Sequence, residues 1–187
     1  MRKQFLGSNN APIKIKEFFS LTCGHCSNFH IKTLPQLKKK YIDTGKVQLE
    51  FIDYPLDRLA VIAATLARSI PTKDGYIEAV NILLKKQKQW AYSKNPLNEL
   101  QSIAKLFGIS SKKFNDISQN IPLMQEIVTK MEKESKNFDI NSTPTFIVND
   151  KYKISGALSF KDFEKELLKS INAVSYTHLR AHETTCH

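Results

Sequence analysis

The chain has 187 residues, of which 41% are hydrophobic, 25% charged and 10% aromatic. This composition supplies enough apolar surface for a folded core and excludes a disordered, fibrous or low-complexity protein. The net charge of +10 raises the question of a polyanionic partner. Because many of the lysines occupy solvent-side helical positions and no nucleic-acid motif accompanies them, we expect a solvated basic surface and no nucleic-acid partner.

Targeting signals are not evident in this sequence. The first residues, MRKQFLGSNNAPIK, are basic but are not followed by the apolar stretch of a secretory signal peptide. No run of 18 apolar residues predicts a transmembrane helix. The sequence therefore leaves two locations open. The protein is either cytoplasmic, or it is exported with a signal peptide that has been removed or is missing from this sequence.

The first part of the chain predicts a strand, a helix and a second strand. Residues 12–21 (PIKIKEFFSL) are rich in Ile and Phe, and residues 47–55 (VQLEFIDYP) read as a second strand. Between them apolar residues recur at helical spacing until Gly45, and Pro35 should kink this helix because it lacks a backbone donor. Two strands joined by one helix predict a right-handed βαβ unit with a parallel sheet.

The long middle part, residues 57–138, predicts helices only. Apolar residues follow helical spacing in successive segments, among them 59–70 and 121–138. Ser110 or Ser111 can cap a short helix between these two. Because no strand pattern interrupts the run, we expect an all-helical insertion.

Strand patterns return after the insertion. Residues 143–148 (TPTFIV) and 151–156 (KYKISG) are joined by Asn149 and Asp150, a two-residue link typical of an antiparallel hairpin. Ser159 then caps a final amphipathic helix, whose inward-facing residues are Phe160, Phe163, Leu167 and Ile171.

The last segment, residues 174–187 (VSYTHLRAHETTCH), shows neither helical nor strand periodicity. It resembles translated adaptor or vector sequence, so we interpret it as a non-native tail and expect it to be disordered. One of the three cysteines, Cys186, lies in this tail. The rest of the chain then has a single pair of thiols, Cys23 and Cys26, with no third cysteine to mispair with them.

Cys23 and Cys26 form a C-x-x-C motif where the first strand passes into the helix. The motif alone is only moderately specific, since zinc sites, structural disulfides and redox dithiols all use it. At the start of a helix, however, unpaired N–H groups and the positive end of the helix dipole favour a thiolate at Cys23. His25 can lower the pKa of Cys23 further by donating to the sulfur or by adding positive charge.

Three segments carry a resemblance to the DsbA family of periplasmic thiol:disulfide oxidoreductases. EFFSLTCGHCSNFH resembles the family's active-site strand and helix, FIDYPLDRLAVIAATLAR its second strand and the entry to its helical domain, and STPTFIVND the loop that faces the disulfide. The resemblance implies an α/β thioredoxin fold with an inserted all-helical domain. The thioredoxin-like domain would comprise residues 1–56 and 139–173, and the inserted domain residues 57–138.

The same resemblance implies the site and its partners. Cys23 is then the nucleophile and Cys26 the resolving cysteine, with Gly24 and a cis Thr143–Pro144 peptide facing the substrate. The expected function is the introduction of disulfides into reduced or unfolded exported proteins in the periplasm. A DsbB-like, quinone-linked membrane oxidase would reoxidise a monomeric protein that needs no cofactor and no metal.

Glu17 is an unusual residue for its position. It shares a face of the predicted strand with Ile15 and Phe19, where a carboxylate is costly unless it is used. It also matches the acidic residue of the family's E-F-F-S stretch beneath the second cysteine. As a hypothesis, Glu17 relays the proton that Cys26 must lose before it attacks a mixed disulfide. The alternative is a solvent-exposed edge residue, because strand faces of parallel sheets are hard to assign from sequence.

Two other functions stay open at this point. The dipeptide Gly24-His25 departs from the Pro-His more usual in DsbA and matches protein disulfide isomerases, so a reductase or isomerase of the same fold is the alternative enzyme. The non-enzyme alternative is a metal-binding protein that uses Cys23, Cys26 and His30, although a fourth ligand is not evident. Otherwise His30 is a buried core residue.

Two aromatic residues of the predicted insertion, Trp90 and Tyr92, are interpreted as packing residues of the helical domain, because aromatic side chains are common core elements.

Overall fold

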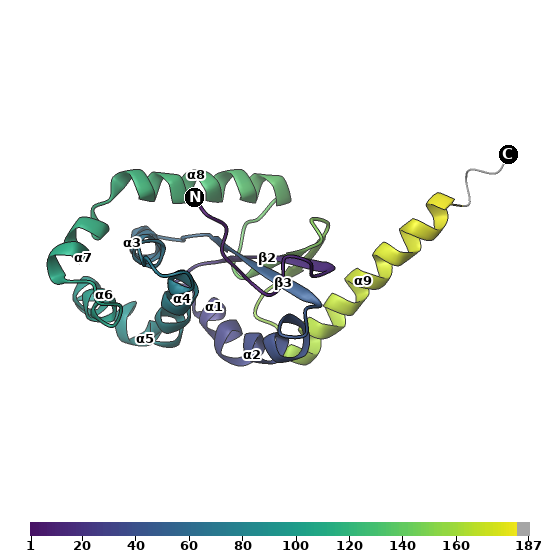
Figure 1. Ribbon diagram of the computed structural model, residues 1–187, viewed down its shortest axis with the longest axis horizontal. Coiled ribbons are helices and arrows are strands. Elements are labelled where there is room, and N and C mark those ends of the chain that lie inside the picture. Colours follow the sequence, from purple (N-terminus) through teal and green to yellow (C-terminus); the bar gives the residue numbers. More distant parts are fainter. Residues whose placement is uncertain (183–187) are drawn as a thin grey trace.

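The computed structural model, shown in Figure 1, describes the backbone of residues 1–182 and the side chains of residues 1–172. A mixed five-stranded sheet lies at its centre, with the strand order β1-β3-β2-β4-β5. The strands are β1 (Phe5–Leu6), β2 (Ile13–Phe19), β3 (Val47–Asp53), β4 (Thr145–Val148) and β5 (Tyr152–Ser155).

The predicted βαβ unit is confirmed. Strands β2 and β3 pair in parallel, with Ile15 opposite Leu49, and the connection between them is helical from Gly24 to Ile42. This connection consists of α1 (Gly24–Asn28), the π-helical η1 (Phe29–Thr33), α2 (Leu34–Leu37) and the π-helical η2 (Lys38–Ile42). Proline in a helix lacks the N–H that would bond four residues back and crowds that carbonyl. Around Pro35 the connection departs from a regular α-helix, since the π-helical η1 lies directly before α2.

Helices alone occupy the segment between β3 and β4, as expected for a helical insertion. They are α3 (Arg58–Arg68), α4 (Gly75–Lys85), α5 (Gln87–Trp90), α6 (Pro96–Lys105), α7 (Ser111–Ser118) and α8 (Ile121–Phe138). The Ser110 hydroxyl accepts from the Lys113 N–H at 3.2 Å, so the predicted cap of α7 is confirmed. Trp90 is buried as predicted, whereas Tyr92 is 69% exposed, so its interpretation as a packing residue is wrong.

The two faces of the sheet are covered by different helices (Figure 1). On one face Phe29 of η1 packs between Phe146 of β4 and Phe163 of α9, with ring centroids 4.5 and 5.5 Å away. On the opposite face Phe18 of β2 meets Phe138 at the end of α8, at 6.2 Å. Helix α8 thus continues from the insertion onto the back of the sheet, where Ile52, Ile140 and Ile147 complete a small core with Phe18.

The predicted hairpin is confirmed. Strands β4 and β5 are antiparallel, but Val148 pairs with Tyr152, so the link has three residues and the expected two-residue link is wrong. Asn149 and Asp150 in this link have φ values of 49° and 55°, in the left-handed region, and the Lys151 N–H donates to the Val148 carbonyl at 3.1 Å. Strand β4 also pairs antiparallel with β2, with Glu17 opposite Phe146. This pairing brings the loop before β4 beside the end of β2.

The final helix, α9, runs from Phe160 to His182. Figure 1 shows its second half leaving the body of the molecule. The expectation of a disordered tail from residue 174 is therefore wrong for residues 174–182, because a nucleated helix gains one hydrogen bond for each residue it adds. Residues 183–187, including Cys186, lie outside the described residues.

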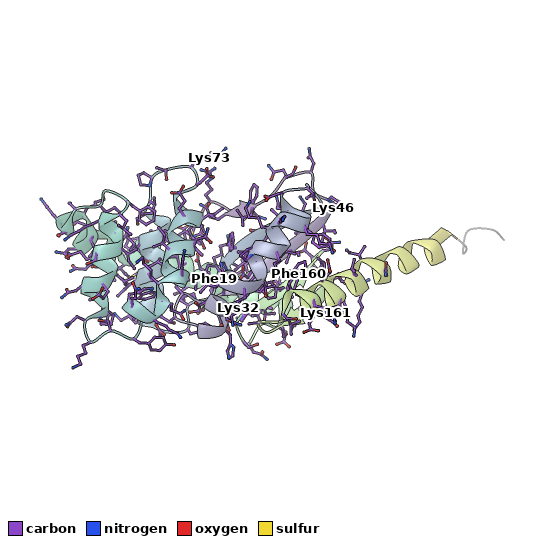
Figure 2. The ribbon with its side chains drawn as sticks, turned by 90° about the horizontal axis from the view of Figure 1, so that it is seen from below. Phe19, Lys32, Lys46, Lys73, Phe160 and Lys161 are labelled. Carbon is purple, nitrogen blue, oxygen red and sulfur yellow. The ribbon has the colours of Figure 1, made fainter. Side chains whose placement is uncertain are left out.

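None of the described helices combines the length and the apolar character that a membrane crossing requires. Charged side chains are spread around the molecule, and the labelled Lys32, Lys46, Lys73 and Lys161 in Figure 2 lie at separate places around it. This distribution agrees with a solvated basic surface.

Candidate active site

Cys23 caps the first turn of the helical connection. It lies in extended conformation directly before α1, and its Sγ accepts the Cys26 N–H at 3.4 Å. The pKa of Cys23 is lowered to about 5, chiefly by the hydrogen bond from the Cys26 side chain, although partial burial opposes the shift. Hydrogen bonding with Thr143 and with the backbone N–H groups of Cys26 and His25 lowers the pKa of Cys23 further. Cys23 is therefore a thiolate at neutral pH.

Cys26 has the opposite character. Its side chain is completely buried, and burial raises the pKa of its thiol far above the ordinary value. The charges of Cys23 and Glu17 raise it further. Cys23 and Cys26 do not form a disulfide in this structure. The pair thus combines one thiolate near the surface with one protonated thiol beneath it.

The loop before β4 lies against Cys23. The Thr143–Pro144 peptide bond is cis, and the Cys23 Sγ lies 3.5 Å from the Thr143 carbonyl oxygen. Cys23 and Thr143 are 120 residues apart in the sequence. The pairing of β4 with β2 brings them together.

Gly24 and His25 are both exposed at the start of α1. The contribution of His25 to the pKa of Cys23 comes from its backbone N–H and not, as the sequence suggested, from its imidazole. A Cβ at Gly24 would lie 3.9 Å from the Tyr92 hydroxyl, which reaches toward the dithiol from the insertion. Nothing in the sequence marked Tyr92 as a neighbour of the cysteines.

Glu17 is completely buried, so its alternative interpretation as an exposed edge residue is wrong. Its Oε1 lies 2.9 Å from the Nε2 of His30, which projects from η1 onto the same face of the sheet. His30 is buried, as one interpretation of the sequence held, with its ring between Phe19 and Phe51 at 5.7 and 5.8 Å. The Glu17–His30 pair lies beneath the dithiol, and sequence reasoning did not find it.

A second contact that the sequence did not reveal is made by Gln87 of α5. Its buried amide Nε2 donates to the carbonyl of Leu21 at 2.7 Å and to that of Cys23 at 2.9 Å. The Ser27 hydroxyl of α1 donates to the Leu84 carbonyl of α4 at 2.8 Å. These three hydrogen bonds join the active-site turn to the insertion.

The proposed metal ligands do not come together as a set. His30 is engaged with Glu17, and within the part of the chain that the structure describes, no three His, Cys, Asp or Glu side chains are grouped so as to hold a metal ion.

This sheet, its helical insertion and a C-x-x-C pair at a helix start define a dithiol protein of the thioredoxin class. A family model described as thioredoxin matches residues 2–169, and the chain belongs to this family.

Proteins named for disulfide chemistry are similar to this chain. A "putative protein-disulfide oxidoreductase" of Rickettsia typhi is 32% identical over 144 residues, which cover 77% of this chain and 53% of the relative. The chain thus spans about half the length of the curated relatives of this group. A "probable disulfide bond formation protein D" of Bacillus anthracis is 28% identical over 177 residues, or 91% of this chain and 77% of that protein.

Solved structures agree with this assignment. The crystal structure of alpha-DsbA1 from Wolbachia pipientis matches with a TM-score of 0.81 and 30% identity, covering 95% of this chain and 94% of that one. BdbD of Bacillus subtilis, at 23% identity and a TM-score of 0.69, shares the fold. The resemblance to the DsbA family and the expected fold class are confirmed.

Proposed function

We propose that this protein is a thiol:disulfide oxidoreductase that oxidises cysteine pairs in exported proteins. The observation that carries the proposal is the contrast between its two thiols. A pKa of about 5 at Cys23 stabilises the reduced form as a thiolate, and every unit by which that pKa is lowered is worth about 1.4 kcal/mol. A stabilised reduced form makes the disulfide form oxidising.

The proposed cycle starts from the Cys23–Cys26 disulfide. A substrate thiolate attacks the Cys23 sulfur, the Cys23–Cys26 bond breaks, and Cys26 leaves as a thiolate that takes up one proton. The second substrate thiol then loses its proton and attacks the substrate sulfur of the mixed disulfide, expelling Cys23 as a thiolate. Two electrons pass from the substrate dithiol to the protein, and its two protons are accounted for by the Cys26 thiol and the solvent.

The other site residues have roles that their positions support. Gly24 would face the substrate from its exposed position beside Cys23. The Thr143 backbone, beside Cys23 and directly before Pro144, would pair with an extended substrate strand. Glu17, buried and electrostatically coupled to Cys26, would accept and return the proton of Cys26. His25 contributes its N–H to Cys23.

Location and partners follow from the same proposal. The substrates are reduced or unfolded exported proteins, the compartment is the periplasm, and a DsbB-like, quinone-linked membrane oxidase restores the disulfide. The relatives named as disulfide oxidoreductases and DsbA support this choice.

A trapping experiment tests the two cysteine roles. Reduced Cys26→Ser, mixed with a disulfide-bonded peptide, should accumulate a mixed disulfide between Cys23 and one peptide cysteine while the other peptide cysteine leaves as a thiol, because the resolving thiol is gone. Cys23→Ser should form none. Iodoacetamide should label Cys23 first in the reduced protein at mildly acidic pH, where only that thiol is ionised. Faster labelling of Cys26 would reverse the assignment.

A second experiment separates the oxidase from its alternatives. The oxidised protein, as a monomer, should oxidise a reduced two-cysteine peptide one for one and barely reactivate scrambled ribonuclease. Its reduction potential against glutathione should lie well above the roughly −270 mV of thioredoxin, toward the roughly −120 mV of DsbA. A potential near that of thioredoxin would favour a reductase, and efficient reactivation by a stable dimer would favour an isomerase.

A further inference from the structure

Tyr92 is an exposed aromatic residue beside the dithiol. It is 69% exposed, more than any other large hydrophobic residue that the structure describes. Its hydroxyl lies 3.9 Å from the position that a Cβ would take at Gly24, the residue that follows Cys23. A single exposed ring elsewhere on the surface would need no explanation. Beside the reactive sulfur, however, the ring lies where a substrate must approach.

The backbone that carries Tyr92 is firmly anchored. Trp90, two residues earlier, is completely buried, and its indole N–H donates to the Leu83 carbonyl at 2.8 Å. The Ala91 N–H donates to the Gln87 carbonyl, also at 2.8 Å. The exposed ring therefore projects from a fixed turn at the end of α5. An aromatic side chain on a fixed backbone loses little conformational entropy when it makes a contact.

The same segment is joined to the cysteine turn. The Gln87 amide donates to the carbonyls of Leu21 and Cys23 at 2.7 and 2.9 Å, and its Oε1 also lies 3.9 Å from the Cβ position at Gly24. Gln87 and Tyr92 thus approach Gly24 from one segment of the insertion. The position of the Tyr92 backbone relative to Cys23 is set by these bonds.

The side chain of Tyr92 is not used by the fold. Among the residues that the structure describes, its hydroxyl has no hydrogen-bond partner, and its ring is paired with no other ring or cation. The other tyrosines whose side chains are described all donate a hydrogen bond; they are Tyr41, Tyr54, Tyr76 and Tyr152. Tyr92 alone in this group keeps its ring and its hydroxyl available to a molecule outside the chain.

The charges of the segment indicate which substrate side chain fits the ring. A cation can lie on the face of a tyrosine. Lys88 and Lys94 are exposed on either side of Tyr92 in the sequence, and residues 85–94 contain no Asp or Glu. This local positive charge disfavours a cationic side chain within about 8–10 Å. An aromatic or aliphatic side chain remains, and aromatic pairs gain more than their buried area alone provides.

We propose that Tyr92 contacts the substrate residue next to the reacting cysteine and favours substrates in which that residue is aromatic or aliphatic. The inference rests on the proposed dithiol reaction and names the kind of substrate sequence that it prefers. The substrate sulfur must reach the Cys23 sulfur, and the neighbouring substrate Cα is 3.8 Å from that of its cysteine. A side chain on this neighbour is within reach of a ring beside Gly24.

Two reduced peptides with two cysteines each test this preference. In one peptide both cysteines are flanked by Phe, and in the other both are flanked by Ser. Each is mixed with the oxidised protein, quenched with acid and followed by mass spectrometry, and the rates are compared per thiolate after the thiol pKa of each peptide has been measured. The variants are Tyr92→Ala and Tyr92→Phe. Ile121→Ala, at the start of α8 and 55% exposed, is the matched control.

The unmodified protein should oxidise the Phe peptide about 3- to 10-fold faster than the Ser peptide, the range expected for one aromatic pair. In Tyr92→Ala the two rates should come within about twofold of each other, because the Phe peptide is slowed. Tyr92→Phe and Ile121→Ala should keep the preference. Reduction by glutathione, which has no apolar side chain, should stay within about twofold in every variant, since the causes of the Cys23 pKa do not include Tyr92.

No preference in the unmodified protein, or an unchanged preference in Tyr92→Ala, would overturn the proposal. So would equal slowing of both peptides and glutathione, because Tyr92 would then act on the dithiol and not on the substrate. Failure of the oxidase proposal would be seen instead in the reduction potential. The preference would then be measured in reverse, with the reduced protein and the disulfide-bonded peptides, where the same contact would favour the Phe peptide.

Discussion

At the residue scale, position within one helical turn divides the two thiols. Cys23 has the cap position and receives hydrogen bonds, whereas Cys26 lies one turn inward and is cut off from water. Hydrogen bonds to the sulfur favour the thiolate at Cys23, whereas burial favours the neutral thiol at Cys26. The reactive order of the pair thus follows from where β2 ends and α1 begins.

The stability of the reduced protein relative to the disulfide form should rise with pH. The pKa of Cys23 in the folded protein, about 5, is below its ordinary value of 9.0. The ionisation of Cys23 therefore adds nothing to the free energy of unfolding of the reduced protein below about pH 5, and adds its full contribution above about pH 9. Between these limits it grows by up to about 1.4 kcal/mol per pH unit. Urea unfolding of both forms at about pH 5, 6 and 7.5 measures the difference. Reduced Cys23→Ser should lose this pH dependence, and a difference that is constant with pH would contradict the expectation.

Removing the Cys26 side chain should raise the pKa of Cys23, because the hydrogen bond from that side chain is the largest cause that lowers it. Cys26→Ala should show the larger rise and Cys26→Ser the smaller, since serine retains a donor. The ultraviolet absorbance of the thiolate, titrated in both variants, measures this. Equal pKa values in the two variants would show that the backbone N–H groups carry the shift.

The residues of the dithiol could be predicted from the sequence because their spacing and the helix start are local features. The contact of Glu17 with His30 could not, since it depends on how a helix lies on a strand and on a π turn that has no sequence pattern. Gln87 stands in a polar run, LLKKQKQ, that resembles any solvated helix face. Its role is visible only when α5 lies against the active-site turn.

At the element scale, local patterns found the long strands and the helix caps at Ser110 and Ser159, but neither the short or irregular elements nor the caps at Asp57 and Asn120. The two-residue β1 pairs with β3 at Phe5 and Glu50, and two residues are too few to show alternation. The predicted strand 12–21 extends beyond β2 because its last residues continue into the active-site turn. Tertiary pairing, rather than propensity, sets these limits.

Gln87→Leu should destabilise the protein by about 1–3 kcal/mol, because the Leu21 carbonyl loses its amide partner in a buried place. Chemical denaturation measures the loss. The matched control is Gln89→Leu, two residues further in the same helix, where the side chain is exposed and the change should be less than about 0.5 kcal/mol. Similar values for the two variants would show that the Gln87 contacts contribute nothing.

The buried ion pair between Arg68 of α3 and Asp53 of β3 ties the insertion to the sheet. The Nη2 of Arg68 lies 2.7 Å from the Oδ2 of Asp53, and both side chains are almost inaccessible to solvent. Arg68→Leu should cost about 3–5 kcal/mol, because Asp53 is left charged and buried. Lys38→Ala, which breaks the exposed pair with Asp43, should cost less than about 1 kcal/mol in the same unfolding experiment. A small loss in Arg68→Leu would mean that water reaches Asp53.

At the scale of the whole molecule, the insertion and the sheet are joined at several places, and the division of the chain at residues 57 and 138 remains a proposal. Helix α8 begins in the insertion and ends against Phe18 on the back of the sheet. Gln87 and Ser27 join α5 and α4 to the active-site turn. Because the insertion and the sheet both contribute residues around the dithiol, a change in the position of one relative to the other would alter the environment of Cys23.

Deleting residues 174–187 should leave the melting temperature and the thiol-oxidation rate unchanged. The buried side chains of α9 among those described are Phe163, Leu167 and Ser170, all of which precede the deletion. Leu167→Ala removes one of these contacts and should cost about 2–5 kcal/mol, which lowers the melting temperature by about 5 °C or more. Thermal unfolding of both proteins provides the comparison. A fall of several degrees on deletion alone would show that the segment stabilises the fold, and would end its interpretation as a non-native tail.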